Sequence, residues 1–181
     1  VPTPMRSEDL AGRRLVILLF DTSSMEPEDV QRSVDSAREY VASEMSTADL
    51  VAVATVSTIL NVITDFTSDP AVVTAALNQL SYSDGTEEPP PSASTVATDE
   101  EAAAATEDAA ADAEAAELEM FNNDLRLRAL RTLAESLTAI EQKKAILYFS
   151  AGMQRSGQDN QVELRAAINA AVRANVSIYP V

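Results

Sequence analysis

The pattern of apolar and polar positions along the chain predicts five strands. Apolar runs place these strands at residues 15–20, 50–57, 60–66, 145–150 and 176–181. Runs that are apolar at nearly every position are typical of strands buried on both faces of a parallel sheet. The gap between the second and third runs is too short for a crossover helix. These two strands are therefore expected to form a hairpin.

Apolar residues at helical spacing predict helices between the strands. The first begins near Pro27, where Glu28 and Asp29 suit a first turn, and the second begins at Asp69-Pro70. Two further helices are expected at about 118–141 and at 161–174. The residues expected to face the core are Val30, Val34, Ala37 and Val41 in the first helix; Val73, Leu77 and Leu80 in the second; Phe121, Leu125, Leu130, Leu133, Leu137 and Ile140 in the third; and Leu164, Ile168, Ala171 and Val172 in the fourth.

This order of elements predicts the fold class and the domain organisation. Alternating strands and helices with one hairpin indicate a doubly wound α/β domain, with a mostly parallel sheet and one antiparallel edge strand. We expect residues 1–12 to form a flexible lead-in and 13–181 to form the domain.

An acidic segment rich in Ala and Pro interrupts the domain at about 87–120. It contains eleven Asp or Glu residues and no Lys or Arg. Three consecutive prolines at 89–91 favour polyproline II, and the Ala-rich part at 98–119 favours an exposed helix. The segment is either a solvated spacer or a recognition arm for a basic partner.

Charge and composition narrow the classes of function. A formal net charge of −16 disfavours nucleic acid and anionic membrane surfaces as partners. The chain contains neither Cys nor His, which excludes thiol nucleophiles, thiolate zinc sites and the commonest general base. No apolar run is long enough to predict a transmembrane segment. These properties favour cations, basic proteins or neutral surfaces as partners.

The first candidate site directly follows the strand at 15–20. Asp21, Ser23 and Ser24 come at its carboxyl end, the edge at which open α/β sheets bind ligands. Carboxylate and hydroxyl oxygens are the ligands that hard cations prefer. The alternative is that Asp21 is a turn residue that caps the next helix.

The run Asp21-Thr22-Ser23-Ser24-Met25 resembles the Asp-x-Ser-x-Ser loop of the von Willebrand factor A (VWA) domain family. Stretches at 125–140, 144–153 and 173–180 resemble the acidobacterial-type members of that family. The resemblance spans about 13–181 and implies the strand order 3-2-1-4-5. It also implies a sixth strand and a final helix, which have no counterpart in the sequence up to Val181, and a secreted or cell-envelope location.

The family resemblance also implies a metal-ion-dependent adhesion site built from three loops. In the first loop, an ungapped alignment puts Met25 in place of the family's second Ser, whereas deleting one residue puts Ser24 there. Thr86, in Asp84-Gly85-Thr86, is the best match to the Thr of the second loop. The implied metal ligands are therefore Asp21, Ser23, Ser24 and Thr86, with Mg²⁺ or Ca²⁺ as the ion.

The third loop departs from the family pattern. Ala151 in Ser150-Ala151-Gly152 stands where the family has an Asp, and a methyl group cannot bind a cation. The adhesion site is therefore degenerate, and any ion is expected to bind weakly or not at all.

We interpret the chain as a non-catalytic protein-binding or adhesion module with a degenerate metal site. The expected partner-binding residues are Met25, Ser83, Asp84, Ser150, Ala151 and Gly152. The alternative is a structural or assembly domain whose ion site is vestigial and whose contacts use the acidic segment or the sheet edge. We expect no enzyme, because the chain has no glycine-rich nucleotide loop after the first strand and no Walker loop.

Overall fold

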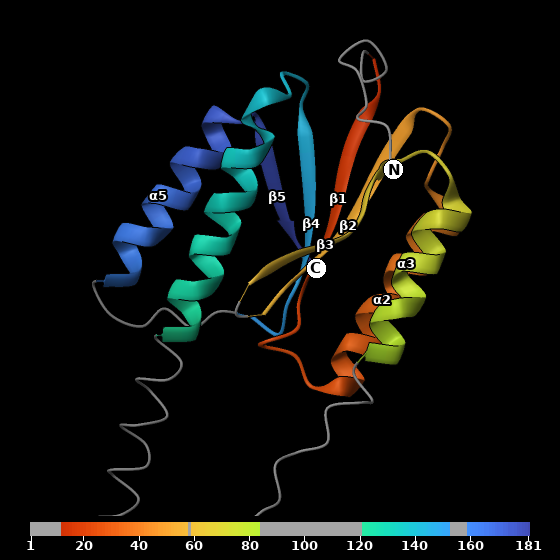
Figure 1. Ribbon diagram of the computed structural model, residues 1–181, viewed down its shortest axis with the longest axis horizontal. Coiled ribbons are helices and arrows are strands. Elements are labelled where there is room, and N and C mark those ends of the chain that lie inside the picture. The colour runs from red at the N-terminus through yellow and green to blue at the C-terminus, as the bar shows by residue number, and fades with distance from the viewer. Residues whose placement is uncertain (1–11, 58, 84–120, 153–158) are drawn as a thin grey trace, which may run out of the picture.

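The computed structural model describes residues 12–57, 59–83, 121–152 and 159–181, which contain a five-stranded sheet (Figure 1). The strand order is β3-β2-β1-β4-β5, and every neighbouring pair is parallel except β2 and β3. This confirms the predicted fold class, strand order and antiparallel edge strand. Residues 1–11 of the predicted lead-in and the acidic segment at 87–120 lie outside the described residues. The strands are β1 Arg14–Asp21, β2 Asp49–Val56, β3 Leu60–Thr67, β4 Lys144–Phe149 and β5 Val176–Pro180.

Helices cover both faces of the sheet (Figure 1). α2 (Pro27–Ser43) and α3 (Pro70–Ser83) pack on one face. A helix at 121–136, continued by a 3₁₀ turn at Leu137–Ala139, packs on the other face with α5 (Asp159–Arg173). Within the described part of the chain, no helix is long and apolar enough to cross a bilayer.

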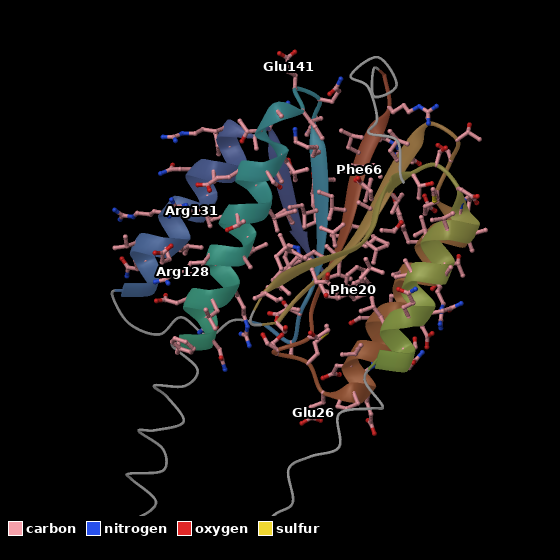
Figure 2. The ribbon with its side chains drawn as sticks, in the orientation of Figure 1. Phe20, Glu26, Phe66, Arg128, Arg131 and Glu141 are labelled. Carbon is pink, nitrogen blue, oxygen red and sulfur yellow. The ribbon has the colours of Figure 1, made fainter. Side chains whose placement is uncertain are left out.

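β1 lies in the centre of the sheet, and its residues from Leu15 to Asp21 are all buried. Successive side chains of a strand point to opposite faces, so Leu18 and Phe20 pack toward α2 and α3. Phe20 lies inside the molecule (Figure 2), where its ring stacks on Phe149 with centroids 4.7 Å apart. Ile17 and Leu19 pack toward the 121–136 helix and α5.

An ion pair joins β1 and β2 at the amino edge of the sheet. Asp49 is fully buried and accepts hydrogen bonds from Arg14 Nε at 2.5 Å and Nη2 at 2.8 Å. The backbone N–H and the hydroxyl of Ser46 donate to the same carboxylate at 2.8 and 3.0 Å. The Arg14 hydrogen bond holds the pKa of Asp49 below its ordinary value.

The predicted inner faces of α2 and α3 are confirmed, because each of their expected core residues is buried. In the 121–136 helix and the following turn, Leu130, Leu133 and Leu137 are buried as expected, but Phe121 is 61% exposed. Phe121 precedes Leu130 by about two and a half helical turns and so points to the opposite side.

Arg128 and Arg131 lie between this helix and α5 (Figure 2). Arg128 Nε lies 3.8 Å from Oε1 of Glu163, and Arg131 Nη1 lies 4.0 Å from Oε2 of the same residue.

The predicted inner face of α5 is wrong at three of four positions. Ala171 is buried, but Leu164, Ile168 and Val172 are 39%, 52% and 72% exposed. Alanines form the inner face instead, because small side chains let the helix axis approach the sheet closely. The buried residues of α5 and its carboxyl end are Ala167, Ala170, Ala171 and Ala174.

Candidate binding site at the carboxyl edge of the sheet

The candidate site lies where the chain diverges from two neighbouring parallel strands. β1 leads into α2 on one face of the sheet, and β4 leads toward α5 on the other face (Figure 1). Such a divergence leaves a crevice beyond the carboxyl ends of the two strands, and open α/β sheets bind ligands there. The predicted residues of the first and third loops follow β1 and β4, so the fold brings both loops to this crevice.

The carboxylate of Asp21 is fully buried, and both of its oxygens accept hydrogen bonds. Oδ1 accepts from the hydroxyl of Ser23 at 2.6 Å and from the Ser23 backbone N–H at 3.2 Å. Oδ2 accepts from the hydroxyl of Tyr148 at 2.8 Å and lies 3.1 Å from Nε of Arg126. Asp21 is therefore the centre of a buried polar network that joins β1, β4 and the 121–136 helix.

Arg126 supplies the positive charge of this network. Its side chain is only 9% exposed, and its Nε also donates to Ser23 Oγ at 3.1 Å. Nη1 donates to the side-chain oxygen of Asn123 at 3.0 Å, one helical turn earlier. A buried charge is costly unless it is paired and hydrogen-bonded, and here the guanidinium and the carboxylate of Asp21 satisfy each other.

Tyr148 completes the network from β4. Burial, followed by the nearby charge of Asp21, raises the pKa of Tyr148 well above its ordinary value. The phenol therefore keeps its proton and acts as a hydrogen-bond donor to Asp21. The contact also ties β4 to the carboxyl end of β1, over a sequence separation of 127 residues.

Ser24 connects the first loop to the third. Its hydroxyl donates to the backbone oxygen of Asp21 at 3.1 Å and accepts from the backbone N–H of Ala151 at 3.3 Å. Met25 instead packs against the core on the α2 side, where its sulfur accepts from the Ser33 hydroxyl at 3.4 Å. Of these two residues, Ser24 makes the hydrogen bond to the third loop.

A hollow of about 360 Å³ opens beside these two loops, on the side of the sheet covered by α2. Three of the six predicted partner-binding residues line it, namely Met25, Ser150 and Ala151. Arg32, whose side chain is 74% exposed, adds a cation that is paired with Asp29 at 2.9 Å. The lining of the hollow thus combines apolar side chains, hydroxyls and an exposed ion pair. Its lining comprises Met25, Asp29, Arg32, Ser33, Ser36, Phe149, Ser150, Ala151 and Val181.

The other predicted site residues are placed only in part. Gly152 follows Ala151 with a φ of 103°, a conformation that favours glycine. Ser83 is the last residue of α3, and Figure 1 shows α3 ending on the side of the molecule where α2 begins. Asp84 and Thr86 lie outside the described residues.

The described residues of this edge do not fit a divalent cation. Both oxygens of Asp21 and the hydroxyl of Ser23 already contact donors, and the positive charge of Arg126 lies beside them. The third loop presents the methyl group of Ala151. Across the part of the chain that the structure describes, no group of three or more acidic, His or Cys residues could hold a metal ion. Binding of a divalent cation at Asp21 stays a prediction from the sequence, and these contacts argue against it.

Sequence reasoning missed Arg126, Asn123 and Tyr148. A signal was present for the first two, since Asn123, Arg126 and Leu130 follow helical spacing and continue the stripe of buried leucines. Two polar residues on an otherwise apolar stripe indicate a buried network that needs a partner. The network's second strand residue, Tyr148, has no such signal because it lies within an apolar run.

Comparison with known proteins finds similarity to solved structures only. No family model matches the chain, and no curated protein matches it. Among solved structures, the chain is similar to the crystal structure of the SpRpn10 VWA domain, with a TM-score of 0.37 and 10% sequence identity. That similarity covers 93% of this chain and 88% of the other. At this level, the similarity assigns neither a family nor a function.

Proposed function

We propose that this chain is a non-catalytic protein-binding or adhesion module of the VWA type, with its binding face at the carboxyl edge of the sheet. The observation that supports this proposal is the hollow at the point where β1 and β4 diverge, which three of the predicted partner-binding residues line. The resemblance of the loop at 21–25 supports the same assignment. The resemblance of the stretches at 125–140, 144–153 and 173–180 to acidobacterial-type members implies a location in the cell envelope or outside the cell.

The chemistry of the hollow suits a protein surface. Its lining includes the apolar side chains of Phe149 and Met25 and the exposed pair of Arg32 and Asp29. Interfaces commonly combine an apolar centre with a polar rim. The contact of Ser24 with Ala151 fixes the two loops against each other, so a partner would meet a pre-organised edge. The sequence contains no His or Cys, which excludes a thiol nucleophile and an imidazole general base.

Site-specific photo-crosslinking tests the proposal. A photoreactive amino acid would replace Arg32 or Ser150 at the hollow, with Thr132, on the outer side of the 121–136 helix, as the matched exposed control. Each variant would be expressed in the source organism, irradiated and examined by mass spectrometry. We expect the same partner from both positions in the hollow and none from Thr132. The proposal is wrong if neither position at the hollow yields a specific partner.

A second candidate is the assembly domain, in which the other edge of the sheet makes the contacts. Ile178 and Tyr179 of β5 are 36% and 49% exposed, and β5 pairs only with β4 among the described strands. An open strand edge with apolar neighbours invites strand addition. A photoreactive residue at Tyr179 distinguishes the candidates, since crosslinks from Tyr179 alone would favour assembly through this edge.

A further inference from the structure

We propose that Arg126 is the built-in cation of the carboxyl edge, that it takes the place of a divalent metal ion, and that this edge holds its shape without metal. The proposal concerns the same edge as the proposed function but is tested without a partner. It rests on the contacts of three side chains: Asp21, Ser23 and Arg126.

The guanidinium already contacts the groups that a cation would use. Nε of Arg126 lies 3.1 Å from Asp21 Oδ2 and 3.1 Å from Ser23 Oγ. The hydroxyl of Ser23 directs its hydrogen to Asp21 Oδ1, so its lone pairs are the atoms that face Arg126. A metal ion could bind these oxygens only after displacing the guanidinium.

The charge balance points to the same conclusion. The carboxylate of Asp21 is matched by the single positive charge of the Arg126 guanidinium. The third loop adds no second carboxylate, because Ala151 stands there. A divalent ion entering this buried space would meet a like charge at close range, and one carboxylate could not offset both its lost hydration and that repulsion.

The guanidinium is also oriented before any ligand arrives. Asn123 and Arg126 lie about one turn apart on the same helix, and the side-chain oxygen of Asn123 accepts from Nη1 at 3.0 Å. This contact aims Nε at the β1 loop. Arg126 therefore performs the structural task that a metal ion would perform, which is to tie the first loop to its surroundings.

Thermal melting of the purified full chain tests the proposal. The native protein would be heated in chelator and in millimolar Mg²⁺, Ca²⁺ or Mn²⁺, beside an Asp21→Asn variant. We expect the native melting temperature to be the same in all of these solutions. A rise in Mn²⁺ that Asp21→Asn abolishes would overturn the proposal, whereas a rise that persists in Asp21→Asn would locate the ion elsewhere and support it.

A converted variant supplies the positive test. Combining Arg126→Ser with Ala151→Asp removes the resident cation and adds a carboxylate to the third loop. If Arg126 occupies the place of an ion, this variant should gain a rise in melting temperature in Mn²⁺, and adding Asp21→Asn should abolish that rise. A folded variant that does not respond to Mn²⁺ would contradict the proposal.

If the converted variant does not fold, paramagnetic resonance of Mn²⁺ titrated into the native chain decides. Loss of free-ion signal to the same extent in the native chain and in Asp21→Asn supports the proposal. Greater loss in the native chain overturns it. Because none of these three experiments uses a partner, this proposal and the proposed binding function can fail separately.

Discussion

Replacing Arg126 by Met should destabilise the fold strongly, because the change leaves a buried carboxylate without its counter-ion. Met keeps an unbranched apolar stem but cannot donate to Asp21, Ser23 or Asn123. Breaking a buried ion pair by removing one partner costs about 3–5 kcal/mol. The loss is a large share of the roughly 5–15 kcal/mol by which native proteins are stable.

Urea unfolding followed by circular dichroism measures this loss. In a domain of this size, each kcal/mol lowers the melting temperature by about 2–4 °C, so a fall of about 6–20 °C should accompany it. Arg131→Met is the matched control. Arg131 pairs with Glu135 at 2.9 Å, but the two side chains are 45% and 56% exposed. Removing a surface pair should cost no more than about 1 kcal/mol.

A double-mutant cycle with Asp21→Asn separates the ion pair from other effects of the change. Each single variant leaves one charge buried without its partner, whereas the double variant leaves neither. Its loss should therefore be smaller than the sum of the single losses by at least about 1 kcal/mol. The buried network would be refuted as a source of stability if the losses of unfolding free energy were additive. It would also be refuted if Arg126→Met lost as little as Arg131→Met.

Three further predictions follow from particular contacts. Tyr148→Phe removes a hydrogen bond to a buried carboxylate and should cost about 1.5–3 kcal/mol in urea unfolding at neutral pH. Asp49 has a lowered pKa in the folded state, so its stabilising contact with Arg14 is present above the ordinary value of 3.8 and is lost as pH falls below it. The stability gap between the native chain and Asp49→Ala should accordingly shrink as pH falls from about 5 to about 3; a constant gap would exclude this ionisation. Ala170→Leu should lower the free energy of unfolding by about 1–3 kcal/mol, because it overpacks the inner face of α5. Ile168→Ser, on the exposed face, should lower it by about 0.5 kcal/mol or less. A larger loss for Ile168→Ser than for Ala170→Leu would show that the two faces of α5 are assigned wrongly.

Local sequence patterns predicted an element and its buried face correctly where the apolar positions formed a single run or a single stripe. The apolar runs predicted all five described strands, since a strand buried on both faces has few polar positions to obscure it. α2 and α3 each have one apolar stripe, and that stripe is buried. In α5, a leucine, an isoleucine and a valine compete with a stripe of alanines, and hydrophobicity alone selects the wrong stripe. The choice depends on how closely the helix approaches the sheet, which is a property of the packed structure.

The sequence by itself determined the fold class, the strand order implied by the family resemblance, and the crevice to which Asp21, Ser24 and Ala151 belong. Only the tertiary structure decided what surrounds Asp21. Ser23 and Arg126 are 103 residues apart in the chain, and Asp21 and Tyr148 are 127 apart. Helical spacing indicates which face of a helix is buried, but not which charge on another element it meets. That pairing depends on where the packed sheet places the end of β1, and burial there makes an unpaired charge too costly to keep.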